Sequence, residues 1–321
     1  MNIMFLIFSY HTGGIERLLI DMTNTLVKKG ESVSVCIIND TYDKELLSFY
    51  HSEVDILYLN RPVNTGSRLN YMMEFASLVN IKNIDVLHCQ DVNCVIFASI
   101  AKFSRPSMKI FDTVHDTFAF GEYSAFKIFF EKRLCHCVIS ISESVKKTIL
   151  KRGVPEKKIR VVYNAIDTKR FPLHHKAGAF HNPPVLGMVA RIAPKLKGQD
   201  ILIEALALLS DEFPTLECRF AGAPAKDDEA DYQSLLQLVD HYGLSKRVAF
   251  LGDIKNVSDF LRDIDIFILP SRKEGFGISL IEAMSTGLPC IASDNEGPAE
   301  IITDQTLGLL FSCESAQALA D

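Results

Sequence analysis

The sequence predicts a two-domain α/β protein in which each domain is built on a doubly wound parallel sheet. Short apolar runs alternate with amphipathic stretches along the chain, which is typical of such sheets. A stretch rich in proline, glycine and histidine, residues 168–184, interrupts this alternation near the middle. At 321 residues the chain also exceeds what one hydrophobic core usually supports. We therefore expect a first domain at 1–167, a linker at 168–184 and a second domain at 185–321.

The first half of the chain contains the first set of predicted strands, which are short runs rich in apolar and β-branched residues. They are Ile3–Phe8, Ser32–Ile38, Val54–Leu59, Val86–His88, Lys109–Val114, Cys137–Ser140 and Arg160–Val162. A helix is predicted at Ile15–Lys29, because apolar side chains recur there at helical spacing and Gly30 can end the helix.

The second half repeats this alternation. It predicts strands at Val185–Ala190, Glu217–Ala221, Val248–Leu251 and Ile264–Leu269, and helices at Gln199–Leu209, Tyr232–Tyr242 and Val257–Arg262. The stretch Pro270–Glu282 follows the last of these strands and precedes another apolar run, Cys290–Ala292. This order predicts a strand, a tight glycine loop, a helix of about three turns and a further strand.

Composition and charge exclude several classes of protein. Apolar residues make up 48% and charged residues 23%, as in ordinary globular proteins. The net charge of −6 argues against a nucleic-acid partner. No apolar stretch approaches the roughly 20 residues of a membrane-spanning helix, and the chain enters a strand at once, so no signal peptide is expected. The eight cysteines are scattered without a Cys-x-x-Cys pair, which predicts reduced thiols and a cytoplasmic location.

The glycine loop at Pro270–Glu282 has the features of a phosphate site. Gly275 and Gly277 allow the backbone to approach a ligand, and the helix behind them offers unpaired N–H groups. Glu274 lies just before this helix, and Glu282 is expected roughly two turns inside it. Two other interpretations remain open: the glycines serve only the turn, or the segment is a dinucleotide fingerprint, whose last glycine position is occupied here by Leu280.

The pattern Glu274-Gly-Phe-Gly followed by Glu282 resembles the signature of retaining glycosyltransferases with the GT-B fold, specifically the family-four group. Further segments of that family pattern occur in the same order along essentially the whole chain. They are Thr12–Arg17, Thr113–Asp116, Val138–Ser142, Val161–Asp167, Val189–Arg191, Lys197–Gly198, Ala221–Gly222, Phe250–Gly252 and Gly297–Glu300. The resemblance implies two Rossmann-like domains facing a central cleft, the first on the acceptor side and the second binding a nucleotide sugar.

By this resemblance, the second domain holds the donor. Arg191 and Lys197 would contact the diphosphate, whose developing negative charge two fixed cations can stabilise without a metal. Lys195 is a rival to Lys197, which we prefer because it directly precedes a glycine. Glu282 would accept hydrogen bonds from the ribose hydroxyls, and Glu274 would contact the transferred sugar. The backbone amides of Phe276, Gly277 and Ile278 would meet the phosphate or the sugar.

The first domain contributes two further site predictions. Gly13 and Gly14 form the loop after the first strand and open a helix, which makes them candidates for donor binding. His115 ends a predicted strand, and in the family a histidine here binds the sugar or assists near the reacting centre. A structural role for this histidine is the alternative. Asp116, Ser142 and Asn164 are weaker candidates.

The resemblance also implies a reaction without a protein nucleophile, in which the departing phosphate deprotonates the acceptor hydroxyl. Catalytic roles therefore fall on His115, Arg191, Lys197 and Glu274, and no cofactor or metal is expected. The string Asp263-Ile264-Asp265 resembles a metal-binding motif of the other major transferase fold. It begins a predicted strand at the end opposite the ligand loop, so we interpret it as structural.

Donor and acceptor remain open at this stage. A UDP-sugar is the first choice and GDP-mannose the second, and the acceptor would be a glycan or a lipid-linked saccharide. The aromatic and basic stretch Phe126–Arg133 either touches an anionic membrane surface at the inner face of the cell membrane or forms part of the core. A nucleotide-sugar epimerase of the same fold and a non-catalytic binding scaffold are the other functions considered.

A further expectation concerns the C-terminal end of the second domain. Members of this family usually continue with more helices beyond the position equivalent to Asp321. Either the second domain is truncated at its C-terminus, or the natural chain is short.

Overall fold

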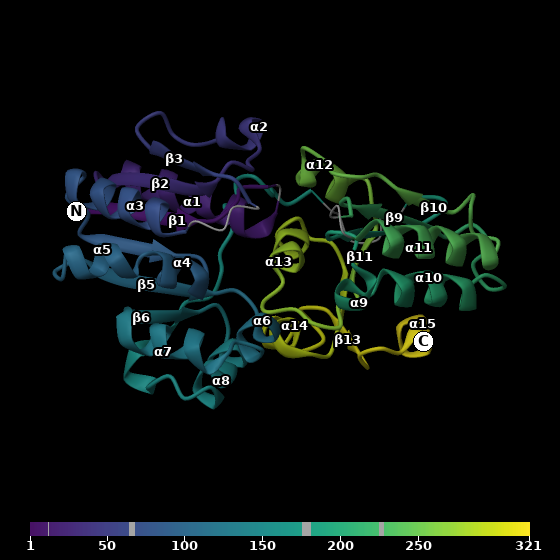
Figure 1. The fold of residues 1–321 in the computed structure, drawn as a ribbon. Helices are drawn as coiled ribbons and strands as arrows, with labels where there is room; N and C mark the ends of the chain where they lie inside the picture. The colour runs from purple at the N-terminus through teal and green to yellow at the C-terminus, as the bar shows by residue number, and fades with distance from the viewer. Residues whose placement is uncertain (12, 64–67, 175–180, 225–227) are drawn as a thin grey trace. The chain divides into compact units, whose positions relative to one another are not determined.

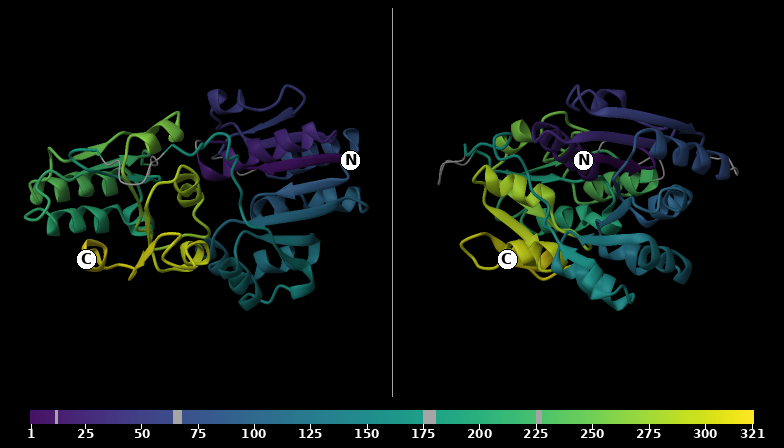
Figure 2. Two further views of the ribbon diagram at one scale, coloured as in Figure 1. Left: turned by 180° about the vertical axis from the view of Figure 1, so that it is seen from behind. Right: turned by 90° about the vertical axis from the view of Figure 1, so that its left-hand side faces the viewer.

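The computed structural model describes residues 1–11, 13–63, 68–174, 181–224 and 228–321. The described chain divides into two compact units, Met1–Asn164 and Ala165–Asp321, and each contains its own parallel sheet. Both sheets carry helices on their two faces, as Figures 1 and 2 show. The predicted class, α/β with two doubly wound parallel sheets, is therefore confirmed.

The sheet of the first unit has the strand order β3-β2-β1-β4-β5-β6-β7. Its strands are β1 (Asn2–Ile7), β2 (Ser32–Asn39), β3 (Asp55–Arg61), β4 (Val86–Cys89), β5 (Lys109–Val114), β6 (Cys135–Ser140) and β7 (Ile159–Val161). The central strand β1 is paired on both sides, with Leu6 opposite Cys36 and Cys89. Strand order reverses between β1 and β4, which is where ligands bind in open parallel sheets.

The helices of the first unit connect these strands. They are α1 (Gly14–Lys28), α2 (Lys44–Leu47), α3 (Leu69–Ile81), α4 (Val92–Phe97), α5 (Ser99–Ser104), α6 (Thr117–Gly121), α7 (Ala125–Leu134) and α8 (Glu143–Lys151), with a 3₁₀ turn at Glu156–Lys158. The predicted helix Ile15–Lys29 corresponds to α1, which buries Leu19, Ile20 and Val27 on its inner face.

The sheet of the second unit has the strand order β10-β9-β8-β11-β12-β13. Its strands are β8 (Val185–Val189), β9 (Glu217–Ala221), β10 (Val248–Phe250), β11 (Ile266–Leu269), β12 (Cys290–Ser293) and β13 (Leu309–Phe311). Leu186 of β8 pairs with Cys218 on one side and Ile266 on the other. The order reverses between β8 and β11, so this sheet has an equivalent binding position.

The helices of the second unit are α9 (Pro194–Lys197), α10 (Gln199–Leu208), α11 (Glu229–His241), α12 (Val257–Arg262), α13 (Ile278–Ser285), α14 (Glu296–Ile301) and α15 (Ala316–Ala320). Their buried apolar side chains form two clusters on the sheet. In Figure 1 the glycine loop singled out in the sequence connects β11 to α13.

The stretch 168–184, which the sequence suggested as a linker, packs on the second unit where the structure describes it. Phe171 is 4% exposed within the core of that unit, and its carbonyl accepts a hydrogen bond from Ser285 Oγ. His181 donates from its backbone N–H to Asp265 Oδ1. The division between the units falls after Asn164, three residues before the predicted end of the first domain. Residues 175–180 lie outside the described residues.

Two further sequence interpretations can be compared with the structure. All eight cysteines are free thiols, and six of them are buried, so they pack as small core side chains. In the part of the chain that the structure describes, no helix combines the length and apolarity needed to cross a lipid bilayer.

Candidate active site

The glycine loop between β11 and α13 is tied to the loop that follows β8. The carbonyl of Leu196 accepts hydrogen bonds from the backbone N–H groups of Arg272, at 2.8 Å, and of Lys273, at 3.2 Å. The Arg272 guanidinium forms two hydrogen bonds with the Asp200 carboxylate, at 2.7 and 2.8 Å. Such a bidentate pair fixes geometry as well as adding energy. The two loops at the reversal point of this sheet therefore form a single structure.

Gly198 makes the close approach of these loops possible. Its φ of 72° lies in the left-handed region that favours glycine. A Cβ atom at this position would lie 2.0 Å from the carbonyl oxygen of Pro270, which no side chain could accommodate. Gly198 ends the short helix α9, and Lys197 is the last residue of that helix. The glycine thus determines where the Lys197 side chain begins.

Lys197 reaches across to the glycine loop. Its Nζ lies 2.7 Å from Glu274 Oε2, and the two side chains are only 26% and 16% exposed. Ser271 Oγ is a second donor to the same oxygen, at 3.4 Å. Lys195 instead pairs with Asp231, and its side chain is 82% exposed. Of the two lysines considered from the sequence, the structure brings Lys197 and not Lys195 onto Glu274.

Arg191 follows β8 and lies on the same edge of the sheet. Its side chain is 55% exposed, and its Nε is 4.0 Å from Asp228 Oδ2. Its carbonyl accepts a hydrogen bond from the buried Gln199 Nε2, at 2.8 Å, which anchors the backbone there. Arg191 and Lys197 therefore come from the same loop but are held by different carboxylates.

The N-terminus of α13 has no side-chain cap. Gly277, at its N-cap, has a φ of 108° and supplies no side chain to the first amides of the helix. Gly275 and Phe276 are buried behind it, and Ile278 is the first helical residue. Gly297 packs so closely against Phe276 that a Cβ atom there would lie 2.3 Å from the Phe276 Cα. Its N–H also donates to the Glu274 carbonyl, at 3.0 Å.

The expected length of this helix is wrong. Helix α13 has eight residues, about two turns, because the chain turns at Gly287, whose φ is 82°, and the N–H groups of Gly287 and Leu288 donate back to Met284 and Ala283. Glu282 is half-buried and lies about one turn from the start, not two. Its carboxylate is therefore closer to the glycine loop along the helix than the sequence suggested.

In the first unit, Gly13 is the N-cap of α1 and Gly14 its first residue. A Cβ atom at Gly13 would lie 2.5 Å from Glu16 Oε2, so the Glu16 carboxylate lies directly against this glycine. Burial raises the pKa of Glu16 above its ordinary value. Thr12 lies outside the described residues. The structure thus places the two glycines at a helix start, as predicted, with an acidic side chain of the same helix over Gly13.

His115 directly follows β5 and lines a cavity of about 390 Å³. Its Nε2 is 3.1 Å from the side-chain oxygen of Gln90. Burial and, second, the nearby His88 lower the pKa of His115 to about 3. The imidazole is therefore neutral near pH 7. With Nε2–H donating to Gln90, Nδ1 is left as a hydrogen-bond acceptor.

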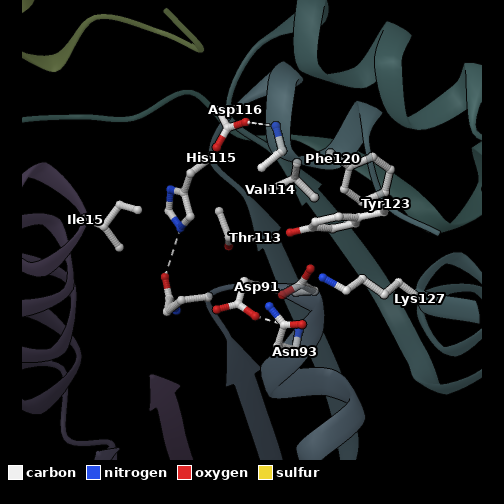
Figure 3. Close-up of a pocket in the computed structure, with 13 residues that line it drawn as sticks. Ile15, Asp91, Asn93, Thr113, Val114, His115, Asp116, Phe120, Tyr123 and Lys127 are labelled. Atoms are coloured by element: carbon white, nitrogen blue, oxygen red, sulfur yellow. Dashed lines mark hydrogen bonds between the residues drawn. The ribbon is translucent and has the colours of Figure 1, made fainter. Parts of the chain in front are cut away.

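The cavity lies wholly within the first unit, at the carboxyl ends of β4 and β5. Figure 3 shows Tyr123 and Lys127 extending into it from one side, with Ile15 on the opposite side. Two of its acids are N-caps: Asp91 Oδ1 accepts from the Asn93 N–H at 2.6 Å, and Asp116 Oδ1 accepts from the Ala119 N–H at 2.6 Å. Ser142, another weak candidate from the sequence, similarly caps α8 through the Val145 N–H.

A buried pair of carboxyl groups adjoins this cavity, which one of them, Asp112, lines. Asp112 of β5 and Glu131 of α7 are 1% and 0% exposed. The two carboxyl groups are hydrogen-bonded to each other. One carboxyl must therefore be protonated and donate to the other. Burial raises the pKa of Asp112 well above its ordinary value and that of Glu131 to about 7.

Several of these residues were not singled out from the sequence. Gln90 and Asp91 could have been found, because they directly follow the strand Val86–Cys89 at the edge where ligands bind. Asp112 is an acid within an apolar strand, which was a signal that a partner is buried with it. Nothing in the sequence links Arg272 to Asp200, because that pair depends on how two distant loops meet.

In the acidic string Asp263-Ile264-Asp265, just before β11, the Asp265 carboxylate is held by hydrogen bonds within the second unit. Asp265 is 1% exposed and accepts hydrogen bonds from the His181 N–H, the His181 ring and the Val185 N–H, at 2.7 to 2.8 Å. Among the described residues, no group of three or more histidine, cysteine or acidic side chains is arranged to hold a metal ion.

Two family profiles together match almost the whole chain. Residues 12–170 match the profile described as Glycosyltransferase Family 4, and residues 169–321 match that described as Glycosyl transferases group 1. Among solved structures, HepE from Anabaena, crystallised with UDP and glucose, superposes with a TM-score of 0.85. It is 24% identical, and the match covers 100% of this chain and 88% of HepE. That likeness shows a shared GT-B fold.

Relatives of known name are similar at moderate identity. The lipopolysaccharide core mannosyltransferase LpsB of Rhizobium meliloti is 31% identical over 170 residues, which are 50% of this chain and 48% of LpsB. The lipopolysaccharide 1,6-galactosyltransferase of Escherichia coli K12 is 25% identical over 313 residues, 93% of this chain and 81% of that enzyme. The chain thus spans about half the length of some curated relatives and four fifths of others.

Proposed function

The chain belongs to the group 1 glycosyltransferases of family four, and we propose that it is a retaining hexosyltransferase that uses a nucleotide-diphosphate sugar. The observation that carries the proposal is the contact between Lys197 Nζ and Glu274 Oε2 beside the uncapped start of α13. These groups bring a cation, a carboxylate that would bind the sugar and the start of a helix without a side-chain cap to the reversal point of one sheet.

The donor diphosphate would lie against the start of α13, with Lys197 and Arg191 on the loop after β8. As the glycosidic bond breaks, the leaving diphosphate gains negative charge, which fixed cations and helix amides stabilise. Lys197 would move from Glu274 to the phosphate, and Arg191 would leave its weak contact with Asp228. This exchange frees the Glu274 carboxylate to accept hydrogen bonds from hydroxyls of the transferred sugar.

Glu282 would bind the ribose. It is half-buried and about one turn along α13, so its carboxylate lies on the helix whose first amides face the phosphate. We expect Glu282→Ala to weaken nucleotide binding while changing kcat less, because the ribose contacts are the same in substrate and transition state.

The base of the donor is proposed to be uracil. HepE was crystallised with UDP and with UDP-glucose, and that structure shares the fold over the whole of this chain. The E. coli relative is named a galactosyltransferase. A GDP-mannose donor is the second candidate, because LpsB is named a mannosyltransferase.

The reaction proposed is a front-side displacement with retained configuration. The acceptor hydroxyl attacks the anomeric carbon from the side that the diphosphate leaves, and its proton passes to the departing phosphate oxygen. No protein base and no metal are required by this scheme. His115, neutral and with Nδ1 available as an acceptor, would hold a hydroxyl of the sugar near the reacting carbon.

The acceptor is proposed to be a glycan or lipid-linked saccharide used in polysaccharide biosynthesis, bound by the first unit. The helix α7 supports a lipid-linked form. Phe126 and Phe129 are 63% and 59% exposed, and their rings contact Phe130, so the interpretation of these aromatics as core is wrong for Phe126 and Phe129. The buried positions of α7 are Ile128 and Glu131.

The charge around this aromatic face suits an anionic membrane. Residues 122–160 contain ten Lys or Arg and four Asp or Glu, a net charge of +6 in a chain of net charge −6. Exposed aromatic rings beside basic residues are the combination that binds an anionic lipid surface. We therefore propose a cytoplasmic protein that is peripheral at the inner face of the cell membrane.

A single experiment separates this function from its alternatives. The protein is incubated with UDP-glucose, UDP-galactose or GDP-mannose, and the nucleotides are followed by ³¹P and ¹H NMR. A transferase releases the nucleoside diphosphate, slowly to water and faster to an acceptor. An epimerase interconverts nucleotide sugars without releasing the diphosphate, and a binding scaffold leaves them unchanged. Either of these last two outcomes would overturn the proposal.

A further inference from the structure

Arg61, the last residue of β3, is a buried cation with no carboxylate partner among the described residues. It is 6% exposed, and its hydrogen-bond partner is the neutral side-chain amide of Asn39, which is also 6% exposed. None of the ion pairs in the described part of the chain includes its guanidinium. Buried charges in proteins are normally paired, because an isolated charge loses its hydration on burial. The guanidinium therefore needs a counter-charge, which an anionic ligand could supply.

The guanidinium is held along one edge and on one face. Its Nε and Nη2 donate to Asn39 Oδ1, at 3.0 and 2.7 Å, and its central carbon lies 5.6 Å from the centre of the Phe8 ring. Only the amide oxygen can face these donors, which determines the orientation of the Asn39 side chain. Nη1 and the second hydrogen of Nη2 have no acceptor among the described residues. These N–H groups form a fork that matches two oxygens of a carboxylate or a phosphate.

A pair of hydroxyl groups lies at the other end of the Asn39 amide. Asn39 Nδ2 donates to Ser9 Oγ at 2.8 Å, and the hydroxyl oxygens of Thr41 and Ser9 are 2.9 Å apart. Only one hydrogen can lie between two hydroxyl oxygens, so the other hydroxyl hydrogen has no acceptor in the part of the chain that the structure describes. Both residues are half-buried. Asn39 thus connects a cationic fork to a hydroxyl donor that a ligand can use.

These four residues, which we call the Arg61 cluster (Ser9, Asn39, Thr41 and Arg61), lie at the carboxyl ends of three neighbouring strands. Ser9 follows β1, Asn39 ends β2 and Arg61 ends β3. Ligands bind at this edge of an open parallel sheet. The cavity described above lies on the other side of the reversal point, at β4 and β5, and no residue of the Arg61 cluster is among its described lining residues. Its acidic lining therefore belongs to a different position.

We propose that the Arg61 cluster is an anion site, which binds a phosphate or carboxylate group at the edge of the first sheet. Two oxygens of the anion accept hydrogen bonds from the Nη1 and Nη2 fork of Arg61, and the remaining hydroxyl hydrogen of Ser9 or Thr41 is a further donor. The anion supplies the counter-charge of a guanidinium that is already withdrawn from water. The inference goes beyond the proposed donor site, because it concerns the other unit and does not depend on transferase activity.

The test follows the Arg61 side chain by NMR of the ¹⁵N-labelled full chain. Its Nε–H signal is assigned by the loss of that signal in Arg61→Lys. Sodium phosphate and sodium acetate are titrated in turn, with one equivalent of UDP present to occupy the proposed donor site. We expect a saturable shift of the Arg61 signal with at least one of these anions, and none with sodium chloride at equal ionic strength. No saturable shift with either anion, or the same shift with chloride, would overturn the inference.

Substitution of Arg61 tests the role of its charge. In Arg61→Met the affinity for the anion, measured from the backbone N–H signals of Ser9 and Asn39, should fall at least tenfold. Arg61→Lys keeps the charge but not the fork, so its affinity should fall by less. Arg262→Met removes an equal charge from an exposed side chain of α12 and should change nothing. Unchanged affinity in Arg61→Met, or an equal loss in Arg262→Met, would contradict the assignment. If Arg61→Met does not fold, the wild-type titration decides it.

Further titrations identify the source of the anion. A response to acetate alone would assign a carboxylate ligand. Tighter binding of glucose 1-phosphate than of phosphate would assign the site to a phosphorylated saccharide, and equal binding of the two would assign it to a free anion. If UDP alone shifts the Arg61 signal, and one equivalent of it prevents the response to phosphate, the site belongs to the donor and the inference fails. Absence of UDP binding in calorimetry would contradict the donor proposal only, because the Arg61 signal reports anion binding independently.

Discussion

The two units build the same kind of ligand position and give it opposite chemistry. In both sheets the strand order reverses beside the first strand of the unit, between β1 and β4 and between β8 and β11. At the second of these positions the start of α13 is uncapped and Lys197 lies beside it. At the first, Asp91 and Asp116 cap the neighbouring helices α4 and α6. The uncapped end attracts an anion, whereas the capped ends do not.

The comparison shows that the loops, not the sheet topology, decide what each unit binds. A parallel sheet brings loop residues to one edge, and its strand order determines where on that edge they meet. Whether the N-cap residue of the helix after the strand is Asp91 or Gly277 then changes the charge of the position. One fold can thereby present an uncapped helix start in one unit and helix starts capped by carboxylates in the other.

The largest expected effect is on the loop that supports the donor position. Gly198→Ala places a Cβ atom against the Pro270 carbonyl and adds a side chain at a φ of 72°. Overpacking and the left-handed conformation together should lower the free energy of unfolding by about 3 kcal/mol. Urea unfolding measures this loss.

Gly243→Ala is the matched control, because Gly243 has a φ of 67° and open space around its Cβ position. It should lose only the conformational part, about 1 kcal/mol. Equal losses in the two variants would show that the contact between the two loops is unimportant.

Removing the cation beside α13 should have the next largest effect. Lys197→Met removes the charge that would stabilise the diphosphate and leaves the Glu274 carboxylate without its partner. We expect kcat to fall about a hundredfold, about 2.7 kcal/mol of barrier, as for other groups that stabilise developing charge. Lys195→Met, which removes an exposed lysine paired with Asp231, should stay within about twofold of the wild type in a donor-hydrolysis or transfer assay. A hundredfold loss in the control instead would transfer the role to Lys195.

The first unit should respond to pH through the buried pair Asp112 and Glu131. Burial raises the pKa of Glu131 from 4.5 to about 7, so the folded protein holds a proton that the unfolded chain releases above about pH 4.5. The contribution of the protonated Glu131 to the free energy of unfolding is fully present below pH 4.5 and is lost as pH rises through 7. Unfolding free energy should fall by on the order of 2 kcal/mol between pH 5 and 7. Glu131→Gln should remove most of this slope, measured by urea unfolding at each pH; an unchanged slope would exclude the pair as its source.

The smallest of these effects is expected at Arg191. Its side chain is more exposed than that of Lys197 and its contact with Asp228 is longer, so it has more freedom before a ligand binds. Arg191→Ala should lower kcat at least about tenfold, about 1.4 kcal/mol of barrier. Steady-state kinetics with saturating donor measures it, and wild-type turnover would remove Arg191 from the diphosphate site.

Much of the fold could be predicted from the periodicity of apolar residues. The strands β5 and β9 were predicted with their observed bounds, and the other strands at the centre of each sheet within two residues. The three-residue strand β13 was missed, because Leu309–Phe311 is too short to show a period. The length of α13 was overestimated, because the helix begins only at Ile278, after the glycine loop, and ends before the turn at Gly287.

The site was predictable only where a single loop carries the chemistry. The glycine loop and Lys197 follow from residues close in sequence, whereas the cavity near Gln90 needs four separate segments. The exposed face of α7 was ambiguous for a similar reason. Glu131 occupies a buried position of that helix because Asp112 pairs with it, so the aromatic side chains of Phe126 and Phe129 lie outside the core. A pattern of hydrophobicity cannot reveal a buried acid whose partner is in another element.

The central claim, that the start of α13 with Lys197 forms a nucleotide site, is tested most directly by calorimetric titration. UDP, GDP and ADP are titrated into the protein in EDTA, with Lys197→Met alongside. We predict that UDP binds with a micromolar Kd, tighter than GDP and ADP, and that Lys197→Met weakens it at least tenfold. Absence of binding by all three nucleotides, or binding only after a divalent metal is added, would contradict the account.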